Sequence, residues 1–189
     1  MNEAIQNMLS RRSVRAYEDK KIPRAELEAM VAAGKNAPTG MNRQPYYIMV
    51  VQDDAVLKEV GEIARFDIRR HPNPDFAKRA DDPSFNPTMG APCMIFICGG
   101  TDELFGFPVT DCALVAMNLM NAARSLGIGS CCLGAYGAAG RDPEGAKMFE
   151  KLGVPEGFNV ALGIAFGYPK DGEWPEVKER KGDNVGYLM

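Results

Sequence analysis

Three arginines and a serine lie within five positions near the start of the chain, in the stretch RRSVRAY at residues 11–17. The guanidinium groups of Arg11, Arg12 and Arg15 can form bidentate, charge-assisted hydrogen bonds with a phosphate. The Ser13 hydroxyl adds another donor, and each bond to a charged group contributes on the order of 1.5–3 kcal/mol. A solvated basic patch that follows a helix is the alternative, and for this stretch alone the more common one.

A second polar stretch, NAPTGMNRQPYYIMVV at residues 36–51, leads directly into an apolar run. Its Pro-Thr-Gly turn at 38–40 presents backbone groups and a hydroxyl, and the amides of Asn42 and Gln44 follow just before the run. Side-chain amides at the mouth of a strand can bond the polar edge of a ring such as that of a flavin. The commoner use of these residue types is to cap the turn itself, so both interpretations stay open at this point.

Most familiar catalytic and nucleotide-binding motifs are absent from the sequence. There is no G-x-G-x-x-G for a dinucleotide and no G-x-S-x-G for an activated serine. His71 is the only histidine, so neither a conventional nucleophile–base pair nor a multi-histidine metal site is expected. If the chain is an enzyme, a bound cofactor is expected to supply its reactivity.

The composition is typical of a soluble globular protein, with 189 residues of which 46% are apolar and 25% charged. The net charge of −3 and the isoelectric point of about 5.3 provide no basic face for nucleic acid and no polybasic membrane anchor. No apolar run approaches the ~20 residues of a membrane span, and the first residues lack a signal-peptide core. The odd number of cysteines and the lack of a C-x-x-C pair predict reduced thiols in a cytoplasm: Cys93, Cys98, Cys112, Cys131 and Cys132.

Hydrophobic periodicity indicates the elements that would position the polar stretches. Apolar residues recur at helical spacing in five segments, 3–9, 23–36, 56–63, 107–126 and 142–153. Short β-rich runs predict buried strands at 46–51, 91–100 and 158–169, and residues 127–134 predict a short strand or turn. The arginine stretch therefore follows the first helix, and the amide-bearing turn precedes the first strand.

Residues 66–90 form a long segment with four prolines, mixed charge and no sustained periodicity. Loops of this length are uncommon in compact domains and often act as lids or binding loops, so a lid is one interpretation. The alternative is a surface excursion with one short helix around 76–80. The chain as a whole, residues 1–189, is predicted to form one domain with this segment as its possible lid.

Four motifs in order, spread over about 170 residues, resemble the nitroreductase family of FMN-dependent oxidoreductases. RRSVRAY resembles the family's R-[RH]-S-x-[RK]-x-[FY], and APTGMNRQPYYIMVV resembles A-P-[ST]-x-x-N-x-Q-P-W-x-F-x-V-V, with Tyr46 in place of tryptophan. The run ending in SLGIGSCCLG resembles A-x-x-L-G-[LI]-G-x-x-x-[IL]-[EG]-G, and AFGYPKDGEWPEVKERK resembles the closing G-Y-P … [KR]-x-R. Each motif is weak by itself, but the four together favour the phosphate interpretation of the arginine stretch.

The resemblance implies roles for the residues of the arginine stretch. Arg11 would meet the FMN phosphate, and Arg12 and Ser13 would touch the phosphate or the ribityl chain. Arg15 would lie near the N1–O2 side of the flavin ring, where a fixed cation favours the reduced form. Two further phosphate contacts would come from the C-terminal tail, namely Lys178 and Arg180.

The resemblance also implies contacts from a turn and from a loop. The turn would reach the flavin from the partner subunit, and the backbone N–H groups of the loop would approach flavin N5. The candidate residues are Pro38, Thr39, Gly40, Asn42 and Gln44 in the turn, and Leu133 and Gly134 in the loop. A further family contact, an amide or a lysine, falls within 66–90, where Asn86 and Lys78 are both candidates. The Cys131–Cys132 pair is interpreted as packing residues, because adjacent side chains of a strand point to opposite faces.

The fold implied by the resemblance is α+β, with a mostly antiparallel central sheet flanked by helices and an interlocked homodimer. The implied activity is an NAD(P)H oxidoreductase that passes hydride through FMN to nitroaromatic, quinone or related small-molecule acceptors. No side chain is expected to act as an acid or base, and no metal is implied. The alternatives are a dehalogenase or enone reductase on the same scaffold, or a non-catalytic flavin-binding protein.

Overall fold

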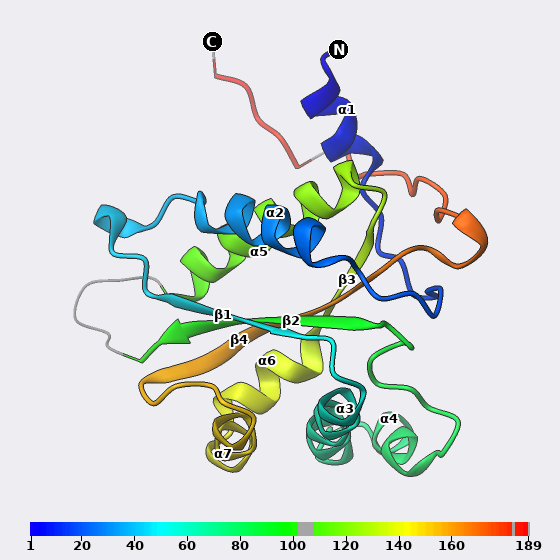
Figure 1. Cartoon of the computed structure of the whole chain (residues 1–189), viewed down its shortest axis with the longest axis vertical. Helices are drawn as coiled ribbons and strands as arrows, with labels where there is room; N and C mark the ends of the chain where they lie inside the picture. Colours follow the sequence, from blue (N-terminus) through cyan, green and yellow to red (C-terminus); the bar gives the residue numbers. More distant parts are fainter. Residues whose placement is uncertain (102–107, 183, 189) are drawn as a thin grey trace.

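The computed structural model describes residues 1–101, 108–182 and 184–188, and is built around one antiparallel sheet in the strand order β1-β2-β4-β3 (Figure 1). The four strands are β1 (Tyr46–Val51), β2 (Cys93–Gly100), β3 (Gly129–Leu133) and β4 (Phe158–Gly167). β2 and β4 are central, and β2 is buried on both faces as far as its last glycine, which explains its uninterrupted apolar sequence. β1 and β3 form the two opposite edges.

Helices cover both faces of this sheet (Figure 1). One face carries α2 (Arg24–Lys35) and α5 (Pro108–Ser125), and the other carries α3 (Asp54–Arg69), α6 (Gly134–Arg141) and α7 (Pro143–Lys151). Successive residues of β2 point to opposite faces, so Ile95 and Ile97 join the core below α2 and α5. Met94 and Phe96 join the second core, against α3, α6 and α7. The predicted α+β fold with helices flanking an antiparallel sheet is confirmed.

The first helix, α1 (Glu3–Ser10), lies outside these two layers and buries none of its residues. The Asn2 side chain caps it by accepting a hydrogen bond from the Ile5 N–H at 3.0 Å. It is joined to α5 by the Asn7 side chain, whose Nδ2 donates to the Asn121 carbonyl at 2.8 Å. Its apolar residues stay largely exposed: Ile5, Met8 and Leu9.

One helix was not predicted from the sequence. α6 begins directly at the end of β3, and its sequence GAYGAAGR has too few large apolar residues to produce a helical pattern. Its glycines allow close packing instead, because a Cβ atom on Gly140 would lie 2.1 Å from the Val160 carbonyl oxygen of β4. The other predicted helices and strands are present, although the predicted start of the long helix at Phe107 falls outside the described residues. Two details were wrong: β1 is a partly exposed edge strand and not a buried one, and the helix predicted at 56–63 extends to Arg69.

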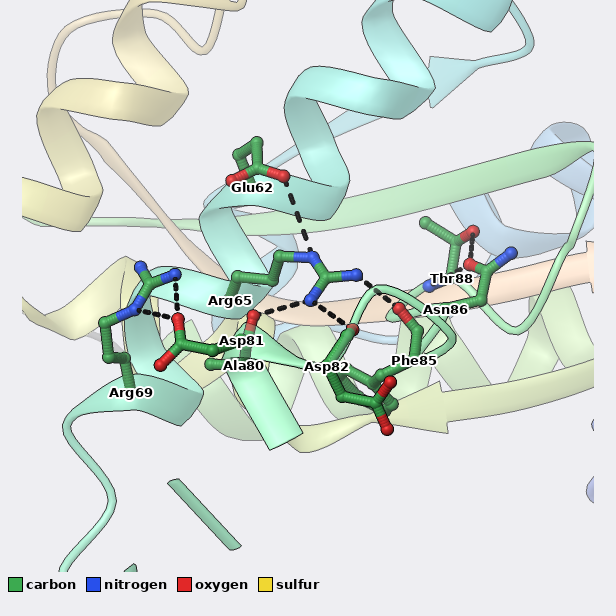
Figure 2. A network of polar contacts seen from close by, with 9 residues as sticks. All are labelled: Glu62, Arg65, Arg69, Ala80, Asp81, Asp82, Phe85, Asn86 and Thr88. Carbon is green, nitrogen blue, oxygen red and sulfur yellow. Dashed lines mark hydrogen bonds and ion pairs between the residues drawn. The ribbon is translucent and has the colours of Figure 1, made fainter. Parts of the chain in front are cut away.

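Much of the segment 66–90 is helical or turned, and it is packed on α3. It contains the end of α3, the short helix α4 (Pro74–Ala77) and a 3-10 turn (Lys78–Asp81). Figure 2 shows the Arg65 guanidinium of α3 inserted among the carbonyl oxygens of the loop that follows. Arg65 Nη1 donates to Ala80 at 2.5 Å and to Asp82 at 3.1 Å, and Nη2 donates to Phe85. The short helix of the second interpretation is present, whereas the lid remains a prediction.

Candidate cofactor site

The arginine stretch runs along the free edge of β3. Ser13 forms a parallel bridge with Ser130, and the Val14 N–H donates to the Ser130 carbonyl at 3.0 Å. The buried Tyr17 fixes the end of the stretch, because its hydroxyl donates to the Val14 carbonyl at 2.7 Å. Burial raises the pKa of Tyr17, so the hydroxyl stays protonated as a donor. The aromatic residue of RRSVRAY is thus the anchor that holds the cationic segment against the sheet.

The arginines are directed by these backbone contacts. Arg11 directly follows α1, and Arg12 Nη1 donates to the carbonyls of Leu9 at 2.6 Å and of Arg11 at 2.7 Å. Arg15 is exposed, and its Nη1 donates to the Ser13 carbonyl at 3.3 Å. Burial raises the pKa of the Cys131 thiol on β3, and the positive charges of Arg15 and Arg11 oppose this rise. The two cations therefore act together on the edge of β3.

The C-terminal tail starts beside the same segment. One hollow of about 400 Å³ is lined by Arg12, Trp174, Pro175 and residues of α1. A second hollow of about 400 Å³ is lined by Ser13 and Arg15, and it shares Trp174 and Pro175 as a wall. The two predicted tail contacts, Lys178 and Arg180, are exposed and follow this wall within a few residues.

The corner between β3 and α6 provides backbone donors. Leu133 is the N-cap residue of α6 and has no side chain that could accept from the first N–H groups of the helix. Gly134, the first helical residue, is exposed, and nothing lies within 4 Å of the position that its Cβ would take. The positive end of the helix dipole and open backbone donors therefore face an accessible space, which suits the acceptor atoms of a flavin ring.

The turn before β1 is held by its own polar groups. The Thr39 hydroxyl accepts from the Gln44 N–H at 3.0 Å, and the Thr39 carbonyl accepts from the Asn42 N–H at 3.0 Å. The Gln44 side chain donates to Asn42 Oδ1 at 3.3 Å. Pro38, Gly40, Asn42 and Gln44 are exposed, and Thr39 is half-buried. Both amides thus contribute to the turn itself, while their solvent-facing sides stay accessible.

One chain does not bring the turn and the arginine stretch together. The turn precedes β1, the arginine stretch follows the edge of β3, and the two strands are separated by β2 and β4. Three strand spacings amount to about 14 Å. Figure 1 shows the turn, between α2 and β1, at the opposite end of the sheet from the junction of α1 with β3. The structure thus places the candidate residues in two groups on opposite edges, and the group at the β3 edge also includes Leu133, Gly134 and the start of the tail.

The two alternatives within 66–90 differ in their contacts. Lys78 Nζ is paired with Asp75 Oδ1 at 3.1 Å. Asn86 Oδ1 accepts from the N–H and the hydroxyl of Thr88, as Figure 2 shows. Its amide nitrogen forms no hydrogen bond with the part of the chain that the structure describes, so both of its N–H donors are available, whereas the charge of Lys78 is already paired.

Trp174 was not predicted as part of the site. It is the only tryptophan of the chain and lies in the closing motif, yet no periodicity or spacing marks it. Within the described residues, no three His, Cys, Asp or Glu side chains are grouped in a way that could hold a metal ion. No helix in residues 1–101, 108–182 and 184–188 has the length and hydropathy needed to span a bilayer.

Comparisons with known proteins identify the family and the fold of the chain. The model of the Nitroreductase family matches residues 8–168. A protein of Archaeoglobus fulgidus, provisionally named NADH dehydrogenase/NAD(P)H nitroreductase, is 33% identical over 90% of this chain and 88% of its own. An FMN reductase (NADPH) of Bacillus subtilis is 28% identical over 89% of this chain and 67% of its own.

Among solved structures, a nitroreductase of Bacteroides fragilis with bound FMN superposes with a TM-score of 0.91. The two chains are 29% identical, and the superposition covers 100% of each. The matched region of the family model starts just before the arginine stretch and ends after β4, so it contains the arginine stretch, the turn before β1 and the β3–α6 corner, but not the tail. The chain belongs to the Nitroreductase family.

Proposed function

We propose that this chain is an FMN-dependent NAD(P)H oxidoreductase. The observation that carries the proposal is the β3 edge, where a backbone-anchored arginine stretch lies beside the uncapped start of α6. A phosphate needs clustered cations, and a flavin ring needs donors for its polar edge. Both are present here on neighbouring rigid elements, and the chain lacks the glycine-rich fingerprint of a Rossmann-type dinucleotide site.

The residues of the β3 edge would divide the cofactor between them. Arg11, with Lys178 and Arg180, would bind the phosphate, and Ser13 would add a hydroxyl donor. Arg12 has one guanidinium nitrogen on the α1 carbonyls, so its remaining donors would face the phosphate or the ribityl chain. Arg15 would lie near the ring, and the N–H groups after Leu133 would face N5. When bound, FMN would supply the hydride transfer chemistry between NAD(P)H and the acceptor.

The side chains of this chain would bind and orient rather than transfer protons. The only histidine, His71, lies in the short connection between α3 and α4. Its ring packs against Phe76, with 4.6 Å between the ring centroids. His71 Nδ1 accepts from the Asn73 N–H at 3.1 Å, which assigns the residue to the local turn. The acceptors proposed for the reaction are nitroaromatics, quinones or related compounds, which can take hydride without a dedicated acid.

We further propose a homodimer in which the turn of one chain completes the β3 edge of the other. The contributing residues of the turn would be Pro38, Thr39, Gly40, Asn42 and Gln44. Large apolar side chains that are exposed on one chain support a partner surface on α1 and α5: Ile5, Met8, Leu9, Leu114 and Met117. A groove of about 730 Å³ between α2 and β1, lined by Leu27, Val31, Ile48 and Val50, adds apolar surface near the turn.

Flavin identity tests the proposal directly. We expect the protein to purify yellow, with about one FMN per subunit and no FAD, because the cations are clustered for one phosphate group. Finding FAD, or no flavin after incubation with excess FMN, would contradict the proposal. An acceptor screen on the FMN-loaded protein then separates the alternatives. Reduction of nitroaromatics or quinones supports a reductase, whereas absence of NAD(P)H oxidation with every acceptor supports a flavin-binding protein.

A further inference from the structure

The single tryptophan of the chain stacks on an arginine at the point where the ordered fold ends and the tail begins. The guanidinium carbon of Arg124, in the last turn of α5, lies 3.9 Å from the centroid of the Trp174 ring. Arg124 Nε is buried and has no hydrogen-bond partner among the described residues. The indole face is therefore the main contact of this cation, and an interaction of this kind strengthens as it is removed from water.

Trp174 lies between the core and the arginine stretch. Its ring packs on the buried cluster that contains Val14 and Tyr17. It also forms part of the wall between the two hollows, with Arg12 on one side and Arg15 on the other. The tail therefore leaves the fold at a residue that lies beside the cations of the β3 edge.

The residues after Trp174 have no comparable anchor. Residues 175–182 and 184–188 form no hydrogen bond or ion pair with the described part of the chain. Lys178 is four residues beyond Trp174 and Arg180 is six, so a fully extended chain carries their Cα atoms at most about 14 Å and about 21 Å away. Fixing Trp174 therefore confines both cations to a small volume around the arginine stretch.

We infer that Arg124 is a positioning residue for the cofactor. Arg124 affects cofactor binding indirectly, through Trp174 and the tail. The Arg124–Trp174 contact holds the start of the tail so that Lys178 and Arg180 reach the same phosphate as Arg11. This inference rests on the proposed function, since it names a further residue of the same site. It predicts that loss of the contact weakens phosphate binding although Arg124 itself touches no cofactor.

The contact is tested first in the flavin-free protein. Arg124→Leu should shift the Trp174 emission to longer wavelength and accelerate tryptic cleavage at Lys178, Arg180 and Lys181 several-fold, because the tail root is released. Arg70→Leu is the matched control, since it removes a cation from the Phe66 ring, 3.8 Å from its centroid, on the far face of the sheet. It should leave tail cleavage unchanged. Unchanged emission and cleavage in Arg124→Leu, with folding verified by circular dichroism, would refute the contact's role.

The effect on the cofactor is tested by FMN titration. We expect Arg124→Leu and Trp174→Ala to raise the FMN dissociation constant about five- to thirtyfold, and Trp174→Phe, which keeps an aromatic face, about twofold. The decisive comparison uses a chain with Lys178→Ala and Arg180→Ala. If Arg124 acts through the tail, Arg124→Leu has no further effect in that background. An equal loss of affinity in both backgrounds would overturn the inference.

Different results would refute the proposed function and the positioning role of Arg124. Absence of FMN binding by the unaltered chain would refute the proposed function and, with it, the cofactor role of Arg124. FMN binding by the unaltered chain, together with an unchanged dissociation constant in Arg124→Leu, would refute the positioning role alone.

Discussion

The two edges of the sheet are built in opposite ways. At the β3 edge, the arginine stretch is fixed by backbone hydrogen bonds to Ser130 and by the buried Tyr17. At the β1 edge, the turn bonds chiefly to itself, and three residues that are not glycine have positive φ: Met41, Asn42 and Gln44. The β3 edge is a rigid, cationic surface, whereas the β1 edge carries an exposed and locally strained turn.

This difference is consistent with the proposal that the β3 edge binds the cofactor and that the turn at the β1 edge completes the site. A cation cluster must be fixed in advance if it is to bind a phosphate without a large ordering penalty. A strained, exposed turn is maintained at functional positions when it presents polar groups to another molecule. Because the two edges are separated by two strands, the proposed shared site requires the turn of one chain to meet the β3 edge of another.

The largest expected effect concerns this division of the site between two chains. Arg11→Glu places a like charge against the phosphate, and Asn42→Trp blocks the contribution of the partner's turn. Each homodimer should be nearly inactive, because both of its sites carry the same lesion. In a mixed dimer, one site collects both lesions and the other carries neither.

Refolding an equal mixture of the two variants should make about half the dimers mixed and restore about a quarter of the wild-type activity. Refolded wild type is the reference, and both parents must be shown to be folded. If demonstrably mixed dimers remain inactive, the site is not shared between edges of different chains.

A second experiment separates the functions within the β3 edge. Arg180→Ala should weaken FMN binding about ten- to a hundredfold through loss of a charged hydrogen bond, and should leave the flavin midpoint potential nearly unchanged. Arg15→Ala should lower that potential, because the reduced flavin loses a nearby positive charge. Titration of FMN and a redox titration measure the two quantities. Equal changes of potential in both variants would contradict the assigned roles.

Local patterns in the sequence predicted most helices and strands, whereas the layered fold and the candidate site residues were predicted from the family resemblance. The run at 93–99 is buried on both faces, so its residue types were sufficient to predict a buried strand. The run at 46–51 was wrongly predicted to be buried, because its apolar residues do not reveal that it forms an edge strand. The pairing of Ser13 with Ser130 joins residues far apart in the chain, and no local signal encodes it. α6 was missed because its glycines serve contact with β4 rather than periodicity, and Arg65 was missed because its acceptors are backbone carbonyls.

Glycine substitutions test whether the β3 edge is packed more tightly than the turn before β1. A Cβ at Gly129 of β3 would lie 2.7 Å from Val14 Cγ2, whereas a Cβ at Gly40 would meet nothing within 4 Å. Gly129→Ala should push the arginine stretch away and destabilise the fold by about 1–3 kcal/mol. Gly40→Ala should change stability by less than about 0.5 kcal/mol. Denaturant unfolding measures both, and equal losses would mean that the two edges are packed alike.

Thiol alkylation reports the electrostatics of the β3 edge. Cys132 is exposed and Cys131 is buried, so iodoacetamide should modify Cys132. Burial of the thiol and the neighbouring Cys131 raise the pKa of Cys132, and the charge of Arg11 lowers it. Since the thiolate reacts, the rate should be low at pH 7 and rise as the pH approaches this raised pKa.

Removing Arg11 therefore raises the pKa further and should slow alkylation at a fixed pH. Arg12→Ala is the control, because Arg12 is not among the charges that act on Cys132. Mass spectrometry of the modified peptide gives the rates. Equal slowing in both variants would mean that Arg11 has no special proximity to this edge.

Substitution of Met41 tests the backbone strain at the β1 edge, and its expected effect is the smallest. Met41 has φ of 50° and is 74% exposed, so its side chain gains little from packing while its backbone occupies the left-handed region. Asparagine adopts this region more readily than methionine and does not add the unfolded-state entropy of glycine. Met41→Asn should therefore stabilise the flavin-free protein by about 0.5–1 kcal/mol. Met41→Ala keeps the backbone penalty and removes the same exposed side chain, so it should change stability little. Denaturant unfolding of the two variants separates the backbone contribution to stability from the side-chain contribution. If Met41→Ala and Met41→Asn raised the free energy of unfolding equally, the methionine side chain and not the backbone would be unfavourable. The turn before β1 would then not be strained at Met41.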